Sequence, residues 1–107
     1  MYYILNEDHE IIQATVQEWA VFFEDGEARR VAFDRFGNGI EVSTVFLGLD
    51  HRLGAGSPLL FETMIFYPES NYPQDEYQER YETWDESVAG HARALEYART
   101  WRAHDRG

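Results

Sequence analysis

Three side chains that can move protons or bind a metal lie in or beside the most apolar part of the sequence, Asp50, His51 and Glu62, and a fourth, His91, lies on the predicted C-terminal helix. Two histidines with two carboxylates can hold a divalent cation or act as general acid and base. Their spacing matches no known metal-binding motif, because the chain contains neither HExxH nor HxH. The alternative is structural, with His51 bonded inside a turn and the His91 ring packed against a sheet.

Glu62 is the member of this group that a structural interpretation explains least easily. It stands between Phe61 and Thr63 in an apolar run. A carboxylate in a central strand needs a partner when it is buried, because an unpaired buried charge is very costly. Arg52 or Arg80 is the partner that we expect, in a structural ion pair.

The strands that would position these side chains are predicted from the hydrophobic pattern. Residues 40 to 49 and 59 to 67 are rich in β-branched and apolar side chains and predict two central strands of an antiparallel sheet. Both carry apolar side chains on both faces, so helices on one face would leave apolar surface for a partner or a second copy. Further strands are expected at residues 2 to 5, 10 to 14, 29 to 36 and 79 to 82.

Two capping boxes predict two helices. In each, a threonine is followed three residues later by a glutamate, at positions 15 and 18 and at positions 83 and 86. The helices are expected at residues 16 to 24 and about 84 to 103.

The second predicted helix has an apolar face. Gly90 lies beside this face and costs about 1 kcal/mol of helix propensity relative to alanine, which indicates close approach to a strand. The side chains expected to face the sheet recur at helical spacing, and they are Trp84, Val88, His91, Ala92, Leu95 and Ala98.

These elements predict an α+β fold: an antiparallel sheet of about five or six strands with two helices, the longer one C-terminal. A chain of 107 residues with 44% apolar residues is expected to form a single domain over residues 1–107. It contains no cysteine, which excludes disulfides and thiolate chemistry. The start of the chain resembles no signal peptide, and no apolar run is long enough to span a bilayer, so we expect a cytoplasmic protein.

The charge is strongly acidic. Twenty acids stand against nine bases, all of them arginines, and the net charge is -11. Such a surface repels phosphate backbones, so direct nucleic-acid binding is disfavoured. It favours docking on a protein with a basic surface. The alternative is that the acidity only keeps a small protein soluble.

One acidic and aromatic stretch is the predicted partner-binding segment. Residues 68 to 77 (PESNYPQDEY) predict a loop, and seven acids lie between Glu69 and Glu86. Tyrosine is favoured at interfaces because it joins a large apolar ring to a polar tip. The alternative is a solvated loop with its aromatic rings folded back on the core. The predicted contact residues are Glu69, Tyr72, Asp75, Glu76, Tyr77, Glu79 and Glu82.

Several runs resemble a family of small phage and prophage proteins of uncharacterised function. They are VSTVFLGLDH at 42 to 51, LLFETMIF at 59 to 66, ERY at 79 to 81, TW at 83 to 84 and AGH at 89 to 91. The runs YYIL, EWAVFFED and RRVAF extend the resemblance over nearly the whole chain, although the loop at 68 to 78 is longer than the resemblance leads us to expect. The resemblance implies a phage or mobile-element origin and no known activity. Small acidic phage proteins often inhibit host defence, as anti-CRISPR proteins do, and extending this to the chain is analogy.

The primary hypothesis is therefore a non-enzymatic binding protein that inhibits a host defence or nucleic-acid-processing complex. It uses protein contacts, with no catalytic residue, metal or cofactor predicted, and a homodimer is left open. The runner-up is a small metal-dependent or ligand-binding enzyme built on Asp50, His51, Glu62 and His91. A virion or assembly component is a third hypothesis.

Overall fold

The computed structural model describes residues 1–49, 57–68 and 77–100. It confirms the predicted class, because the chain forms an α+β fold of six strands in antiparallel sheets with the longest helix C-terminal. The strands divide between a sheet of two and a sheet of four. The elements are β1 (Tyr2–Leu5), β2 (Ile11–Ala14), α1 (Val16–Glu24), α2 (Gly26–Arg29), β3 (Arg30–Arg35), β4 (Glu41–Phe46), β5 (Phe61–Phe66), β6 (Tyr77–Tyr81) and α3 (Trp84–Arg99).

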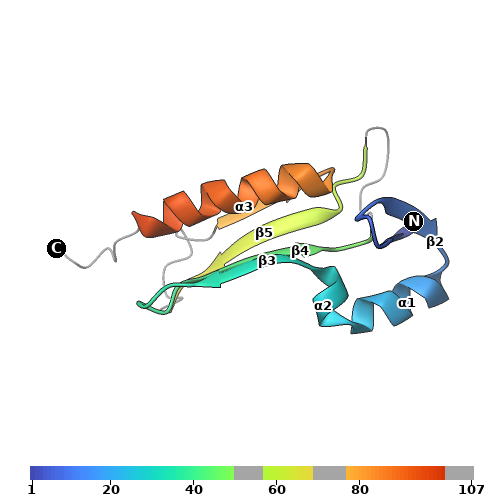
Figure 1. The fold of residues 1–107 in the computed structure, drawn as a ribbon, viewed down its shortest axis with the longest axis horizontal. Coiled ribbons are helices and arrows are strands. Elements are labelled where there is room, and N and C mark those ends of the chain that lie inside the picture. The colour runs from blue at the N-terminus through green and yellow to red at the C-terminus, as the bar shows by residue number, and fades with distance from the viewer. Residues whose placement is uncertain (50–56, 69–76, 101–107) are drawn as a thin grey trace.

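The larger sheet has the strand order β3-β4-β5-β6, with every neighbouring pair antiparallel. The two strands predicted as central are β4 and β5, and they lie in the middle. Strand β6 begins at Tyr77, earlier than the predicted short strand at 79 to 82. Helix α3 runs along one face of this sheet, as Figure 1 shows.

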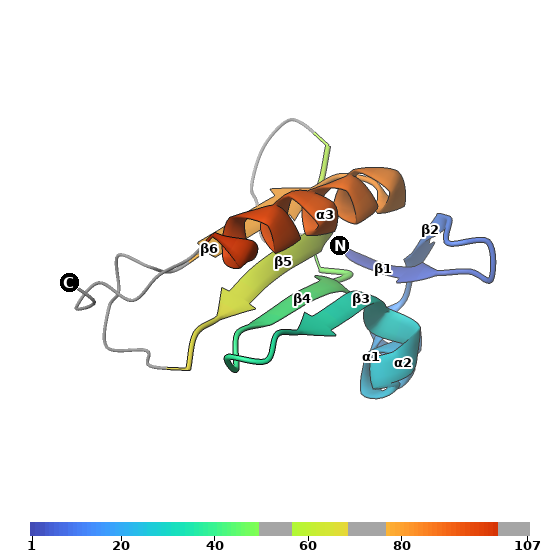
Figure 2. The same cartoon turned by 60° about the vertical axis from the view of Figure 1, so that its left-hand side comes forward.

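The N-terminal hairpin β1-β2 and helices α1 and α2 gather at one end of the larger sheet in both views (Figures 1 and 2). Helix α1 packs mainly on the hairpin. The unit is joined to the segment after β4, because Tyr3 N–H donates to the Gly48 carbonyl at 2.8 Å and Trp19 Nε1–H donates to the Leu47 carbonyl at 3.3 Å. Gly48 has a φ of +71°, and a Cβ there would lie 2.6 Å from the Tyr3 carbonyl oxygen. This turn ends β4 before the predicted boundary at residue 49.

Helix α1 has the predicted bounds and the predicted capping box. Thr15 Oγ1 accepts from Glu18 N–H, and the Glu18 carboxylate accepts from Thr15 N–H. Asp25 closes this helix and also opens α2, since its carboxylate accepts from the backbone N–H groups of Glu27 and Ala28. Helix α2 was not predicted, because a four-residue helix has no hydrophobic period of its own.

The buried face of α3 differs from the predicted one. Trp84, His91, Leu95 and Ala98 are buried or half-buried, but Val88 and Ala92 are exposed. The helix sits on small side chains instead, and its buried residues are Ser87, Gly90, His91, Ala94 and Ala98. The prediction was wrong for Val88 and Ala92 because the buried stripe lies on the side of the helix that carries Ser87, Gly90 and Ala94, and an apolar pattern does not select a serine or a glycine.

Gly90 is the point of closest approach between α3 and the sheet. A Cβ at this position would lie 2.1 Å from the Tyr81 hydroxyl oxygen and 2.2 Å from the ring carbon that carries it. The phenol of Tyr81 therefore rests directly on the helix backbone. This confirms that the glycine marks a close approach to a strand.

The core forms two apolar clusters under α3. One contains Leu5, Phe46, Leu60, Phe61 and Tyr81. The other contains Ile40, Val42, Ile65, Ala94 and Ala98. Buried Thr44 and Thr63 lie between the two clusters in the register of β4 and β5, so the middle of the core is polar.

The opposite face of the four-stranded sheet, which we call the open face, keeps exposed aromatic side chains. Phe33 is 44% exposed and Phe66 is 47% exposed. Strand alternation places both rings away from α3, since the residues opposite them, Ser43 and Glu41, alternate with the buried Val42 and Thr44. The apolar surface left over by the helices is therefore present on this face.

Substitution of Gly90 by alanine is expected to destabilise the fold by about 1 to 3 kcal/mol, because the new methyl group overlaps the Tyr81 ring. The gain in helix propensity is only about 1 kcal/mol and does not offset this overlap. Urea unfolding followed by circular dichroism measures the difference. Gly26→Ala is the matched control, since a Cβ there meets no atom within 4 Å, and it is expected to stay within about 0.5 kcal/mol of wild type. A Gly90→Ala protein more stable than wild type would refute the close contact.

Candidate functional site

The predicted cluster of four polar residues does not come together where the structure describes it. Glu62 and His91 lie on opposite sides of the sheet: Glu62 points to the open face, and His91 contacts residues under α3. Asp50 and His51 fall outside the described residues. Of the described ranges, no group of three or more His, Cys, Asp or Glu residues could hold a metal ion.

Glu62 is held in a structural ion pair. Its side chain is only 10% exposed, and its carboxylate accepts from Arg80 Nε–H at 3.0 Å and from the Gln78 side-chain amide. The cross-strand register places Arg80 directly opposite it on β6. The predicted structural ion pair is confirmed, and of the two expected partners it is Arg80 that pairs, while Arg52 lies outside the described residues.

The partners of His91 link three elements. Its Nε2 lies 2.8 Å from the Asp34 carboxylate on β3, and its Nδ1 lies 2.7 Å from Thr44 Oγ1 on β4. A carboxylate only accepts, so Nε2 carries the proton that is shared with Asp34, and in the neutral ring Nδ1 then accepts from the Thr44 hydroxyl. The histidine thus joins the helix to the edge and the centre of the sheet. This is the packed histidine of the structural alternative.

The hydrogen bonds continue across the sheet to its other edge. Thr44 Oγ1 lies 2.5 Å from Thr63 Oγ1, and the Tyr81 hydroxyl donates to Thr63 at 3.0 Å. The same hydroxyl lies 3.2 Å from the Glu79 carboxylate, to which Arg93 donates at 3.1 Å. Together with His91 and Asp34, these groups form one connected chain, which we call the polar network. Its members are Asp34, His91, Thr44, Thr63, Tyr81, Glu79 and Arg93.

The polar network has the order of a hydrolytic triad but cannot act as one. Asp34, His91 and Thr44 are connected as carboxylate, imidazole and hydroxyl. Yet Thr44 is 0% exposed and its hydroxyl is already bonded to Thr63, so no substrate carbonyl can reach it. A buried polar group without a partner costs roughly 1 to 3 kcal/mol. The network is therefore best explained as a set of polar groups that α3 shields from water and that supply one another's hydrogen bonds.

Burial affects the acidity of the two tyrosines of β6. Loss of solvation raises the pKa of Tyr81 from 10.0 to about 12, and the nearby Glu79 charge acts in the same direction while the bond with Thr63 opposes it. Burial, followed by the charge of Glu79, also raises the pKa of Tyr77. Both phenols stay protonated at neutral pH and are available as hydrogen-bond donors.

Sequence reasoning missed Asp34, Thr44 and Thr63. Each threonine reads as an ordinary strand residue because its β-branched side chain favours a strand on either face. The signal that could have found them is their position: Thr44 lies between Val42 and Phe46 on the same face of β4, so its hydroxyl must be buried with them. Asp34 has no such signal, since it is 57 residues from His91.

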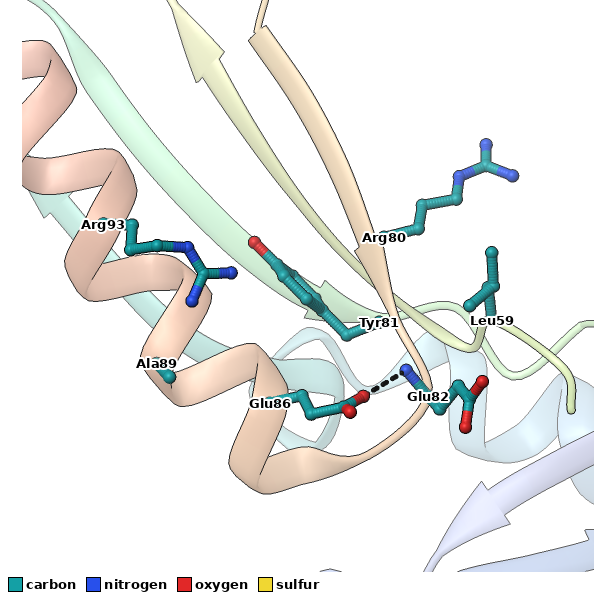
Figure 3. A pocket seen from close by; sticks show the side chains of 7 residues that line it. All are labelled: Leu59, Arg80, Tyr81, Glu82, Glu86, Ala89 and Arg93. Atoms are coloured by element: carbon teal, nitrogen blue, oxygen red, sulfur yellow. Dashed lines mark hydrogen bonds between the residues drawn. The ribbon is translucent and has the colours of Figure 1, made fainter.

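The accessible part of the site is the edge of β6 beside α3. A hollow of about 400 Å³ lies there, and Figure 3 shows Arg93 and Ala89 reaching toward it from the helix and Tyr81 from the strand. At its end the Glu82 N–H donates to the Glu86 carboxylate at 2.9 Å, which is the dashed line in Figure 3. Of the predicted partner-binding residues, Tyr77 and Glu79 lie on β6 and Glu82 follows it. The other four, Glu69, Tyr72, Asp75 and Glu76, fall outside the described residues.

The arginines in the described part of the chain are all engaged. Arg29 donates to the Phe23 carbonyl at 2.8 Å and lies over the Phe23 ring. Each of the others pairs with one glutamate: Arg30 with Glu27, Arg35 with Glu41, Arg80 with Glu62, Arg93 with Glu79, and Arg99 with Glu96. Acids with no cation beside them within the same ranges include Glu82 and Asp85, both exposed at the start of α3.

Comparison with protein-family models, with curated proteins and with solved structures finds no match to this chain. The function must therefore be argued from the residues themselves, and the resemblance to phage proteins stays a prediction. In the ranges that the structure covers, no helix is long and apolar enough to cross a membrane.

Replacing Tyr81 by phenylalanine tests the polar network. At pH 7 the variant loses the hydroxyl bonds to Thr63 and Glu79 and is expected to be about 1 kcal/mol less stable. The folded pKa is raised, so the contribution of the wild-type phenol is fully present below pH 10 and is lost as pH rises through 10 toward 12. By pH 11 wild type is expected to lose about 1 kcal/mol through this group, a loss that the variant lacks. Urea unfolding at a series of pH values measures the two curves, and a constant gap between them up to pH 11 would contradict the buried phenol.

Proposed function

We propose that the protein is a non-enzymatic binding protein that docks on the basic surface of a partner and thereby inhibits a host defence or nucleic-acid-processing complex. The partner is a protein, with contacts centred on the end of β6 and the start of α3. The polar network supplies rigidity to this region and no chemistry.

The observation that carries the proposal is how the charge is distributed. The net charge of the chain is -11, and the described arginines are used internally, five of them in one-to-one pairs with glutamates. Of the other acids that the structure describes, several are exposed and form no ion pair with a described arginine, Glu82 and Asp85 among them. Charge of one sign on a surface steers an oppositely charged partner and speeds association.

The type of partner follows from the same charges. Nucleic acid is disfavoured because binding it requires a basic face that releases counterions, and the chain offers the opposite. A protein that binds nucleic acid has such a face. An acidic protein can occupy it and compete with the natural ligand, which supports inhibition as the outcome of binding. The resemblance to small phage proteins agrees with this outcome as an analogy.

Expression of the protein in cells whose CRISPR–Cas system targets a resident plasmid tests the proposal. We expect plasmid transformation to be restored, and the purified interference complex to bind the protein with an affinity that falls steeply as salt is raised. The double variant Glu82→Gln/Asp85→Asn removes two uncompensated charges at the start of α3 and is expected to bind about tenfold more weakly.

The matched control is Glu7→Gln/Glu24→Gln. It changes the net charge by the same amount at two exposed acids that have no ion-pair partner in the described part of the chain. This variant is expected to bind nearly as well as wild type. Equal losses in both double variants would mean that only total charge matters. The proposal would be abandoned if no defence system were relieved and the purified complex did not bind.

A further inference from the structure

Strand β6 forms one edge of the four-stranded sheet. In the described residues it pairs with β5 on one side and with no strand on the other. Its register with β5 runs without interruption from Tyr77 to Tyr81. A regular edge strand presents a row of unpaired N–H and C=O groups that can template pairing with another chain.

The hydrogen-bond pattern of the sheet identifies which backbone groups face outward. In an antiparallel pair, directly opposed residues alternate between bonded and non-bonded. Phe46 lies opposite Phe61, so the next opposed pair in the β4-β5 register is Leu47 and Leu60. The Leu47 N–H donates to the Leu60 carbonyl at 2.7 Å, which makes this a bonded pair. Counting along the register, the even-numbered residues of β5 bond to β4. The odd-numbered residues of β5, which are Phe61, Thr63 and Ile65, therefore bond to β6.

These residues of β5 lie opposite Tyr81, Glu79 and Tyr77. The alternate residues of β6, Gln78 and Arg80, must then direct their N–H and C=O groups to the free side. Glu82 fits the same alternation, since its N–H is taken by the Glu86 carboxylate at 2.9 Å and not by β5. The side-chain cap at Glu82 closes one end of the edge, and two residues remain open for pairing.

The space beside this edge is suited to an extended chain. The hollow of about 400 Å³ lies beside the end of β6, at Arg80 and Tyr81, with Ala89 and Arg93 on the side of α3 (Figure 3). A strand laid on β6 would direct its side chains alternately to the side of α3 and to the side of the open face. The small side chain of Ala89 leaves room on the helix side.

The other edge of the sheet is less suitable. Strand β3 pairs with β4 through a register shift between Arg30 and Ala32. Such an irregularity bends and twists an edge and is one way in which proteins blunt it against further pairing. Of the two edges, β6 is the one whose register runs without a shift.

We propose that an extended basic segment of a partner protein binds on the edge of β6 and continues the sheet, with its backbone paired to Gln78 and Arg80. This mode rests on the proposed function and specifies where and how the partner docks. Backbone pairing supplies affinity, and pockets for alternate side chains supply specificity.

The charge of the edge selects a basic segment. Arg80 and Arg93 line the hollow but are paired with Glu62 and Glu79. Glu82 and Asp85 are exposed at the end of the edge and form no ion pair with a described arginine. A second copy of this chain is the other possible strand, but each copy carries a net charge of -11 and repels the other. A basic segment is attracted by both acids and also by the net negative charge of the whole chain.

Proline at position 78 tests the backbone pairing. Gln78→Pro removes the outward N–H while leaving the bonds to β5 intact, which is how edge strands tolerate proline. Gln78→Ala is the matched control, because it loses the same side-chain bond to Glu62 and keeps the N–H. The probe is a fluorescein-labelled peptide of alternating arginine and valine, and binding is followed by fluorescence anisotropy.

Wild type and Gln78→Ala are expected to bind this peptide alike, and Gln78→Pro about tenfold more weakly. A peptide with the same arginines and with proline in place of valine should not bind. Equal binding by Gln78→Pro and Gln78→Ala, or equal binding of the proline peptide to wild type, would overturn the edge mode. Those results would leave acidic docking standing. The proposed function itself would fall only if no defence system were relieved and the purified interference complex did not bind the protein. A wild type that does not bind the alternating peptide would also overturn the edge mode.

Amide exchange on the unmodified protein gives a second measurement that does not depend on how the proline variant folds. Adding the alternating peptide is expected to slow exchange at the amides of Gln78 and Arg80 and to leave those of Tyr77 and Glu79 nearly unchanged. Uniform slowing, or none, would contradict the proposal. Sedimentation of the protein alone tests whether the edge pairs with a second copy of the chain. A wild-type dimer that the Gln78→Pro substitution dissociates would assign the edge to self-association and overturn the proposal.

Discussion

The close approach of α3 to the sheet is the constraint on which the rest of the structure depends. The Tyr81 ring lies against the backbone of Gly90, and the buried stripe of the helix is made mainly of small residues. At this distance no water separates the layers, so Thr44, Thr63 and His91 can be satisfied only by one another and by groups at the sheet edges. The polar network is the consequence. It crosses the core from Asp34 to Glu79, whose carboxylates are exposed at its two ends. The buried links between them have no solvent to replace a lost partner.

The same packing determines which surfaces are left for binding. Because α3 covers one face alone, the charged and aromatic residues of the other face are stabilised by cross-strand pairs such as Glu62 with Arg80. Because α3 lies along β6 without pairing to it, the outer side of this strand keeps its backbone groups. Strand β6 is therefore both fixed and accessible. Tyr81 and Glu79 attach it to the polar network, while the backbone N–H and C=O groups of Gln78 and Arg80 face outward.

Features set by local chemistry were predictable from the sequence, and features set by distant contacts were not. The helix at residues 16 to 24 and the two central strands follow from capping boxes and from apolar patterning. The pairing of Glu62 with Arg80 could be predicted because a buried carboxylate requires a cation. The exposure of Val88 could not, because hydrophobicity alone does not reveal that the helix packs through small residues. The link between Asp34 and His91 joins positions 57 apart, and no local pattern reports it.

The acidity of the chain and the open edge of β6 have compatible effects. An unprotected edge strand invites pairing between identical chains, and proteins commonly block it with charge. In this chain the internal ion pairs use the described arginines, so every copy keeps a surface of the same sign and self-pairing is opposed by repulsion. In the proposed binding mode the same charge attracts a basic strand. Specificity in that mode comes from repulsion of the wrong partner as much as from contacts with the right one, which is how selective interfaces are generally built.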